Sequence, residues 1–186
     1  MKDLEALHEL LRARSVRHGD FVLASGRRSS YYIDARLTTM SAEGQALIGA
    51  AGIAAIRAKG WKPAAIGGLT MGADPVAYAV AHASLANGPV IDAFSVRKEA
   101  KKHGTGKKIE GNFSAGSSVV VVEDVITSGG SALQAIEAIQ AEGGVVLGLL
   151  AVVDREEGGR DKVEALGISV VALTTTTSLG LTKTAS

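Results

Sequence analysis

The residues best suited to chemistry in this chain form one unit, in which an acid pair precedes a short glycine-containing turn. Glu123 and Asp124 follow four consecutive valines, and the turn of residues 127–131 leads into a segment of good helix formers. Four β-branched apolar residues predict a strand buried on both faces. Acids at a strand end suit hydroxyl groups or a metal ion, and a small-residue turn that opens a helix presents backbone N–H groups to an anion. The unit therefore predicts a site for a ligand that carries an anionic group beside hydroxyls or a metal ion.

Two common phosphate-binding motifs are absent from the sequence. There is no Gly-x-x-x-x-Gly-Lys-Ser/Thr, which excludes a nucleoside-triphosphate P-loop. There is no Gly-x-Gly-x-x-Gly after a strand, which disfavours a dinucleotide site. An acid pair or a Ser-Gly-Gly turn alone is often only a solvated strand end or an ordinary turn. The prediction therefore rests on residues 119–131 taken as one stretch.

Residues 97–108 form a second unusual segment, dense in Lys and Arg, with His103 and with glycines at 104 and 106. A charge run of this kind is usually a solvated face. The segment lacks the aromatic residues that base stacking would favour, and its glycines suggest a mobile loop that closes over a substrate. A polyanionic small molecule fits these features better than a nucleic acid.

The composition is that of one ordinary globular domain, which we expect to cover residues 1–186. Of the 186 residues, 46% are hydrophobic and 21% charged, and the formal net charge of +1 argues against a strongly cationic nucleic-acid binder. Cysteine is absent, so disulfides, thiolate nucleophiles and cysteine zinc sites are excluded. The first residues are charged and no apolar run approaches the roughly 20 residues of a membrane span. We therefore expect a cytoplasmic protein without a membrane partner.

Strand and helix patterns alternate along the chain, which predicts one α/β domain with a mostly parallel sheet. The predicted strands cover residues 21–23, 31–34, 64–69, 89–96, 119–122, 145–153 and 168–173, and the predicted helices cover residues 4–14, 42–58, 76–86 and 132–139. Ligands bind such sheets at the carboxyl ends of the strands. Gly72, Arg97, Asp124 and Arg155 all follow predicted strands, so they could converge on one site.

Over nearly its full length the chain resembles the type I phosphoribosyltransferases, and within them the branch that uses orotate. Three stretches carry the resemblance, namely residues 25–32, 97–104 and 119–131. The Arg-Lys-Glu-Ala-Lys-x-His-Gly loop is the most discriminating, because purine-using relatives differ there. The resemblance implies a mostly parallel central sheet flanked by helices, with a small N-terminal hood. It also implies transfer of a phosphoribosyl group from 5-phosphoribosyl 1-diphosphate to orotate, giving orotidine 5′-monophosphate and diphosphate in pyrimidine biosynthesis.

The resemblance also implies roles for individual residues. The acids at 123 and 124 would bind the ribose hydroxyls, and the turn of residues 127–131 would hold the 5′-phosphate. Thr127 and Arg155 would contact orotate, with Arg155 facing its carboxylate. The implied catalytic residues are Lys98, Lys101, His103 and Asp124. The full set implied to bind phosphoribosyl diphosphate is Arg97, Lys98, Lys101, His103, Glu123, Asp124, Val125, Ile126, Thr127, Ser128, Gly129, Gly130 and Ser131.

Cofactor and partner expectations follow from the same resemblance. Mg²⁺ would accompany the diphosphate without direct protein ligands, and a homodimer would share loop 97–108 across its interface. The sequence departs from some relatives that carry lysines where this chain has Ala24 and, in the region of residues 67–74, Thr70 and Met71. Arg27 or Arg28 could supply the missing charge.

The residue types suit displacement of diphosphate from the anomeric carbon of a ribose. That reaction builds positive charge on the ribose and negative charge on the leaving group, so positioned cations, a metal ion and carboxylates are its most useful groups. His103 could donate a proton to the departing diphosphate or simply contact a phosphate. Two alternatives stay open: a phosphoribosyltransferase for a purine base, and a non-catalytic regulator that senses phosphoribosyl diphosphate.

Overall fold

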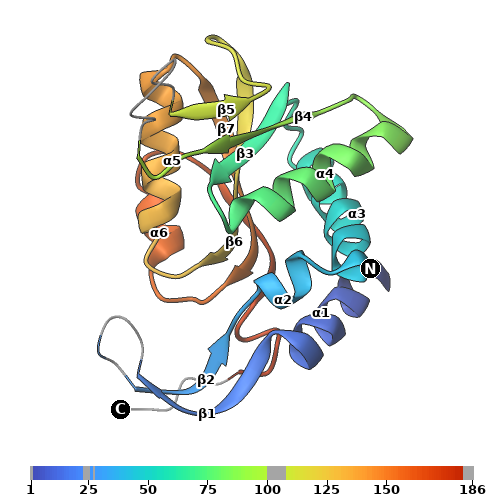
Figure 1. The fold of residues 1–186 in the computed structure, drawn as a ribbon, viewed down its shortest axis with the longest axis vertical. Coiled ribbons are helices and arrows are strands. Elements are labelled where there is room, and N and C mark those ends of the chain that lie inside the picture. The colour runs from blue at the N-terminus through green and yellow to red at the C-terminus, as the bar shows by residue number, and fades with distance from the viewer. Residues whose placement is uncertain (1, 23–25, 27, 100–107, 182–186) are drawn as a thin grey trace.

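A computed structural model of the protein describes residues 2–22, 26, 28–99 and 108–181 (Figure 1). Helices and strands alternate along most of this length, as the sequence predicts. In chain order the elements are α1 (Lys2–Arg14), β1 (Val16–Val22), β2 (Arg28–Ile33), α2 (Arg36–Thr39), α3 (Ala42–Ala58), β3 (Ala65–Leu69), α4 (Ala73–Asn87), β4 (Asp92–Val96), β5 (Ile109–Gly111), β6 (Ser118–Ile126), α5 (Gly130–Ala141), β7 (Val145–Asp154), α6 (Gly159–Glu164) and β8 (Val170–Thr175).

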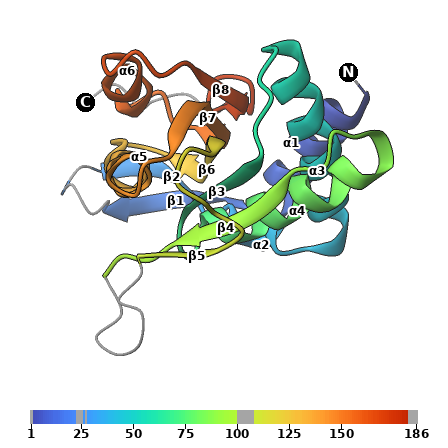
Figure 2. The ribbon, with the colours of Figure 1, turned by 90° about the horizontal axis from the view of Figure 1, so that it is seen from above.

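A six-stranded sheet with the order β5-β4-β3-β6-β7-β8 forms the centre of the molecule. Its strands are parallel except for β5, which pairs with β4 in the antiparallel direction. Figure 2 shows α5 and α6 on one side of this sheet and α1, α3 and α4 on the other. The antiparallel β1-β2 hairpin stands apart as a second small sheet, at one end of the molecule in Figure 1. The predicted α/β fold with an N-terminal hood is confirmed.

Strand β6 contributes to two separate cores, because successive side chains of a strand point to opposite faces of its sheet. Val120 and Val122 belong to the core that includes residues of α1, α3 and α4. Val119 and Val121 belong to the core that includes residues of α5. All four valines are at most 1% exposed, so the apolar run marks a strand buried on both faces, as predicted.

Local sequence features define the ends of two helices. Ser41 caps α3, since its hydroxyl oxygen accepts a hydrogen bond from the Gly44 N–H at 3.1 Å. Gly60 follows the end of α3 with a φ of +68°, a conformation that glycine adopts without strain. Pro75 lies in the first turn of α4, where a missing N–H costs nothing.

The structure differs from the sequence-based prediction in the extent of some elements. Strand β6 continues to Ile126, so the acid pair lies inside the strand rather than after it. Strand β1 starts at Val16 and β4 starts at Asp92, whereas the predicted strands started at residues 21 and 89. The short elements α2, α6 and β5 were not predicted at all, because a few residues are too short a window for a periodic pattern.

Replacing Gly148 with Ala tests the packing of Trp61 against β7. A Cβ atom at position 148 would lie 2.1 Å from Trp61 Cζ2, so the indole would have to move. We expect the free energy of unfolding to fall by about 1–3 kcal/mol, as in other overpacked cores. Denaturation followed by the fluorescence of Trp61, the chain's single tryptophan, measures this loss.

The control for this experiment is Val145→Ala, at a position of the same strand that is 52% exposed. We expect this variant to stay within about 0.5 kcal/mol of the wild type. A Gly148→Ala variant as stable as the control would contradict the close contact between Gly148 and Trp61.

Candidate functional site

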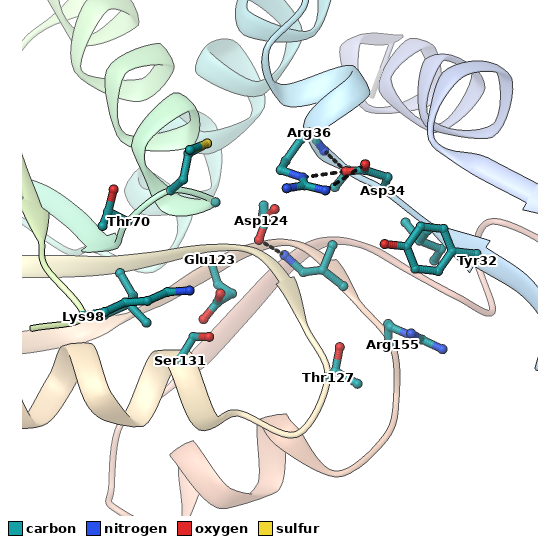
Figure 3. A pocket seen from close by; sticks show the side chains of 16 residues that line it. Tyr32, Asp34, Arg36, Thr70, Lys98, Glu123, Asp124, Thr127, Ser131 and Arg155 are labelled. Carbon is teal, nitrogen blue, oxygen red and sulfur yellow. Dashed lines mark hydrogen bonds and ion pairs between the residues drawn. The ribbon is translucent and has the colours of Figure 1, made fainter. Parts of the chain in front are cut away.

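A cavity of about 500 Å³ lies where the carboxyl ends of β3 and β6 meet the segment that follows the β1-β2 hairpin (Figure 3). This is the edge of a parallel sheet at which ligands bind. The cavity is lined by Tyr32, Ile33, Asp34, Ala35, Arg36, Leu69, Thr70, Met71, Gly72, Lys98, Glu123, Asp124, Val125, Thr127, Ser131 and Arg155.

The two acids reach the cavity from opposite faces of β6. Figure 3 shows Asp124 directed toward Arg36 and Glu123 directed toward Ser131, on the other side of the strand. The ladder between β3 and β6 ends at the pair of Gly67 and Val121, so both acids lie beyond it. On the other edge of β6 the ladder continues, and Glu123 is paired with Ala151 of β7. At the acid pair, β6 is therefore still paired with β7 along one edge, whereas its other edge lies at the cavity.

Gly72 allows the loop after β3 to approach Asp124 closely. A Cβ atom at position 72 would lie 2.5 Å from the Asp124 Oδ1 atom, so no other residue fits there without a shift. Asp124 Oδ1 also accepts a hydrogen bond from the Val125 N–H at 2.8 Å. These contacts fix the orientation of the Asp124 carboxylate at the cavity wall.

Burial raises the pKa of both acids of the pair. Desolvation, followed by the nearby charge of Asp124, raises the pKa of Glu123 to about 8. Desolvation also raises the pKa of Asp124, against hydrogen bonds from backbone N–H groups and the positive charge of Arg36. Glu123 is therefore largely neutral near pH 7 in the free protein, and a bound cation or a positively charged reacting group would favour its ionised form.

A second, smaller cavity of about 100 Å³ adjoins the first and is lined by Glu123 and residues 125–131. It lies at the N-terminus of α5, where the first N–H groups of a helix have no partner within the helix. Gly129 has a φ of +79°, which turns the chain into the helix. Thr127 and Ser131 line both cavities. The arrangement suits a phosphate group attached to a ligand that extends into the larger cavity.

Arg155 lines the cavity but is itself largely buried, with 7% of its surface exposed. Its Nη2 atom lies 2.8 Å from Glu157 Oε1, and its guanidinium carbon lies 5.7 Å from the centre of the Tyr31 ring. Among the described residues, its buried Nε atom has no hydrogen-bond partner. A buried donor that no described residue pairs carries an energetic cost, which an acceptor from a ligand would remove.

The basic segment contributes Lys98 to the cavity, and Figure 3 shows its side chain extending toward Glu123. The Lys98 carbonyl accepts a hydrogen bond from Gln134 Nε2 at 3.0 Å, which ties the start of the segment to α5. Arg97 is not among the lining residues, and its Nη1 atom lies 3.7 Å from Glu110 Oε1. Lys101 and His103 lie outside the described residues, as do the glycines at 104 and 106.

The structure thus brings together most of the described residues that the sequence singled out. The members of the predicted site that line one or both cavities are Lys98, Glu123, Asp124, Val125, Ile126, Thr127, Ser128, Gly129, Gly130, Ser131 and Arg155. Gly72 joins them through its contact with Asp124, whereas Arg97 points elsewhere. Of the adjacent tyrosines, Tyr31 is buried and Tyr32 lines the cavity, as expected for neighbours on a strand.

Sequence reasoning missed the segment that follows β2. Asp34 and Arg36 line the cavity opposite the strand β6, and they form an ion pair with Arg36 Nε at 2.8 Å from Asp34 Oδ1. The available signal was an acid at the last position of a predicted strand and a base two residues later, a pattern that many surface turns share.

The sequence also provided no indication of a hydrogen-bond network that connects the loop after β3 to α4 and β4. Asp74, in the first turn of α4, accepts hydrogen bonds from Thr70 Oγ1 at 2.6 Å and from Ser95 Oγ at 2.7 Å. Since Ser95 belongs to β4, this carboxylate connects the loop wall of the cavity to the strand that leads into Lys98.

No group of three or more His, Cys, Asp or Glu residues in the described part of the chain could hold a metal ion. No helix among the same residues is long and apolar enough to cross a membrane.

Comparison with known proteins places the chain in a family. A family profile described as "Phosphoribosyl transferase domain" matches residues 38–170. The orotate phosphoribosyltransferase of Rhodopirellula baltica is 43% identical over 186 residues, covering 97% of this chain and 95% of the relative. That of Aquifex aeolicus is 46% identical over 176 residues, covering 93% and 95%.

A solved structure agrees with these sequence matches. The crystal structure of Mycobacterium tuberculosis orotate phosphoribosyltransferase in complex with 5-phospho-α-D-ribosyl 1-diphosphate has a TM-score of 0.83 and 41% identity, covering 96% of this chain and 99% of that chain. With the family profile and the two relatives, this shows that the chain belongs to the type I phosphoribosyltransferase family, as one of the orotate phosphoribosyltransferases.

Proposed function

We propose that the protein transfers the phosphoribosyl group of 5-phosphoribosyl 1-diphosphate to orotate, forming orotidine 5′-monophosphate and diphosphate in pyrimidine biosynthesis. One observation carries the proposal: the acid pair of β6 lies between a small cavity at a helix N-terminus and a larger cavity with Lys98 and Arg155. This order of groups corresponds to the order of a 5′-phosphate, a ribose, a diphosphate and a base in the substrates. The relatives named above support the choice of orotate as the base.

In this proposal the ribose 5-phosphate part of the substrate spans the two cavities. Backbone N–H groups of residues 127–131 hold the 5′-phosphate, with the N-terminus of α5 adding its positive dipole end. Glu123 and Asp124 accept hydrogen bonds from the ribose hydroxyls. As diphosphate leaves, positive charge grows on the ribose, and two carboxylates in a poorly solvated site stabilise that charge.

Cations stabilise the leaving diphosphate on the side of the larger cavity. Lys98 lines that cavity, and Arg97, Lys101 and His103 complete the set that the family resemblance implies. His103 is either a proton donor to the diphosphate or a phosphate contact. The roles of these residues stay predictions, and Lys101 and His103 lie outside the described residues.

Orotate is proposed to bind near Thr127 and Arg155. Its carboxylate would face the guanidinium of Arg155, whose buried Nε donor has no partner among the described residues. Arginine suits this task because its planar fork matches a carboxylate. A cation–π contact with the Tyr31 ring, 5.7 Å from the guanidinium carbon, helps to position the Arg155 side chain.

Mg²⁺ is the proposed cofactor, and the residues present fit it. Mg²⁺ is usually bound by one or two carboxylates together with substrate phosphates and water, and the cavity offers the carboxylates of Glu123 and Asp124. When bound, Mg²⁺ would neutralise charge on the departing diphosphate.

A homodimer that shares loop 97–108 is part of the proposal, as is a location in the cytoplasm. Exposed apolar side chains support an interface, since Tyr78 and Leu85 of α4 are 53% and 65% exposed and Met71, just before α4, is 61% exposed. Residues seven apart lie on one face of a helix. Covering such a face by a second copy of the chain would remove it from water.

The activity is tested by following the absorbance of orotate with phosphoribosyl diphosphate and Mg²⁺. We expect orotate to be consumed and hypoxanthine, guanine and adenine to be left unchanged in parallel assays. Turnover of a purine in place of orotate would contradict the choice of base. Binding of phosphoribosyl diphosphate without release of diphosphate for any base would indicate the non-catalytic regulator instead.

Glu123→Gln tests the electrostatic cost of burying this acid. Its pKa rises from 4.5 to about 8 on folding, so as the pH increases the unfolded chain loses the proton before the folded protein does. The wild type should therefore lose stability relative to the variant between pH 4.5 and about 8, with a constant difference above that range. Urea denaturation across this range should give a change of up to a few kcal/mol.

Glu137→Gln is the matched control, because Glu137 is an exposed acid on α5. Its unfolding free energy should run parallel to that of the wild type over the whole pH range. If Glu123→Gln ran parallel as well, the Glu123 carboxylate would not be desolvated in the folded protein.

Mixing two inactive variants tests whether the loop serves the neighbouring subunit. Lys101→Ala removes a cation of the loop, and Asp124→Ala removes an acid of β6. If the loop works in the partner's site, a mixed dimer has one site with both parts intact. Random reassortment should then restore about a quarter of the wild-type orotate turnover.

Each variant kept alone gives the baseline for this experiment, and native mass spectrometry confirms that mixed dimers form. Mixed dimers without recovered turnover would mean that each loop serves its own subunit.

A further inference from the structure

The loop after β3 forms one wall of the larger cavity without contributing a charged side chain. Its residues at the wall are Thr70, Met71 and Gly72. A loop of this kind can offer backbone N–H groups to an anion, but the Thr70 hydroxyl already donates its proton to Asp74. The loop therefore cannot balance the charge of a departing diphosphate. Stabilising such charge in a poorly solvated site requires positioned cations.

Arg36 supplies a cation to the same cavity from the segment that follows β2. It is the first residue of α2, two residues after Asp34, and both residues line the cavity. Its Nε atom lies 2.8 Å from Asp34 Oδ1 and its Nη2 atom lies 3.0 Å from Asp34 Oδ2. A guanidinium has five N–H donors, so this two-point contact holds its plane and leaves further donors for a ligand.

Asp124 is the neighbour that links Arg36 to the loop after β3. Gly72 approaches the Asp124 carboxylate so closely that a Cβ atom would lie 2.5 Å from Oδ1. Figure 3 shows the Arg36 side chain directed toward the same carboxylate, with Asp34 beside it. Arg36 and the loop therefore face the same side of β6, which is the side opposite to Glu123 and Ser131.

We propose that Arg36 binds the diphosphate group of the substrate from this side of β6, and that Asp34 is a positioning residue that holds its guanidinium. The proposal rests on the proposed function, because that function names diphosphate as the leaving group. It adds a cation from α2 to those of the basic segment 97–108. Arginine suits the role, because its fork binds two phosphate oxygens at once.

Arg28 is the competing source of a cation from the same part of the chain. It lies at the start of β2 and forms an ion pair with Asp20 of β1. Their side chains are 76% and 64% exposed, and neither residue lines the larger cavity. The hairpin pair resembles the Asp34–Arg36 pair in chemistry but faces solvent.

Binding of inorganic pyrophosphate in the presence of Mg²⁺, measured by calorimetry, tests the proposal without requiring turnover. Arg36→Met should weaken pyrophosphate binding about 10- to 100-fold, the effect expected for losing hydrogen bonds between charged groups. Arg36→Lys should keep part of the affinity, since it restores the charge without the fork. The control is Arg57→Met, because Arg57 is an exposed residue of α3 whose Nη2 donates to the Gly88 carbonyl.

Two results would overturn the assignment of Arg36. One is unchanged pyrophosphate affinity in Arg36→Met together with a raised KM for orotate, which would place Arg36 at the base. The other is a loss of affinity in Arg28→Met but not in Arg36→Met, which would give the role to the hairpin. Thermal denaturation of each variant separates these outcomes from general unfolding.

The role of Asp34 is tested by Asp34→Asn and by the double variant with Arg36→Met. We expect Asp34→Asn to raise the KM for phosphoribosyl diphosphate several-fold, with a smaller change in the KM for orotate. The double variant should bind pyrophosphate no more weakly than Arg36→Met alone, because Asp34 acts through Arg36. Fully additive losses would contradict a positioning role.

The pyrophosphate-binding experiments and the orotate assay can give opposite outcomes, so they test the role of Arg36 and the proposed function separately. Wild-type protein that binds pyrophosphate through Arg36 but does not consume orotate would refute the proposed function and keep the anion site. Protein that consumes orotate with an unaffected Arg36→Met variant would keep the function and refute the role of Arg36.

Discussion

The placement of two consecutive carboxylates on one strand of a parallel sheet is the constraint on which the site depends. Because neighbouring side chains of a strand point to opposite faces, Glu123 and Asp124 cannot lie together on one wall. One faces the N-terminus of α5 and the other faces Gly72 and Arg36 (Figure 3). A ligand that contacts both acids must therefore pass over the edge of β6, beyond the point where its ladder with β3 ends.

Burial of these acids carries an energetic cost that the fold offsets only in part. Desolvation raises the pKa of each acid, whereas a backbone N–H and the charge of Arg36 favour ionised Asp124. The valines before them, at most 1% exposed, fix the strand through two cores. The first half of β6 is thus buried in the two cores, and the second half carries the acid pair. A cationic ligand or a positively charged transition state would balance the charges of these acids, as is common in reactive sites.

The sequence predicts the features of this fold that arise from long periodic patterns or local chemistry. The valine run of β6, the helix capped by Ser41 and the glycine turn before α5 are of this kind, and so is the acid pair. The ion pair of Asp34 and Arg36 was not predicted, because its place at the cavity depends on how the segment after β2 packs onto the sheet. The Asp74 network joins α4 to β4 by tertiary contacts, which no local pattern encodes.

A crystal structure of the protein with 5-phosphoribosyl 1-diphosphate bound would show whether both carboxylates of β6 hold the ribose. We expect ribose hydroxyls within hydrogen-bond distance of both Glu123 and Asp124, with the 5′-phosphate in the cavity of residues 125–131. A ribose bound away from either carboxylate, or a 5′-phosphate bound elsewhere than at the N-terminus of α5, would contradict this expectation.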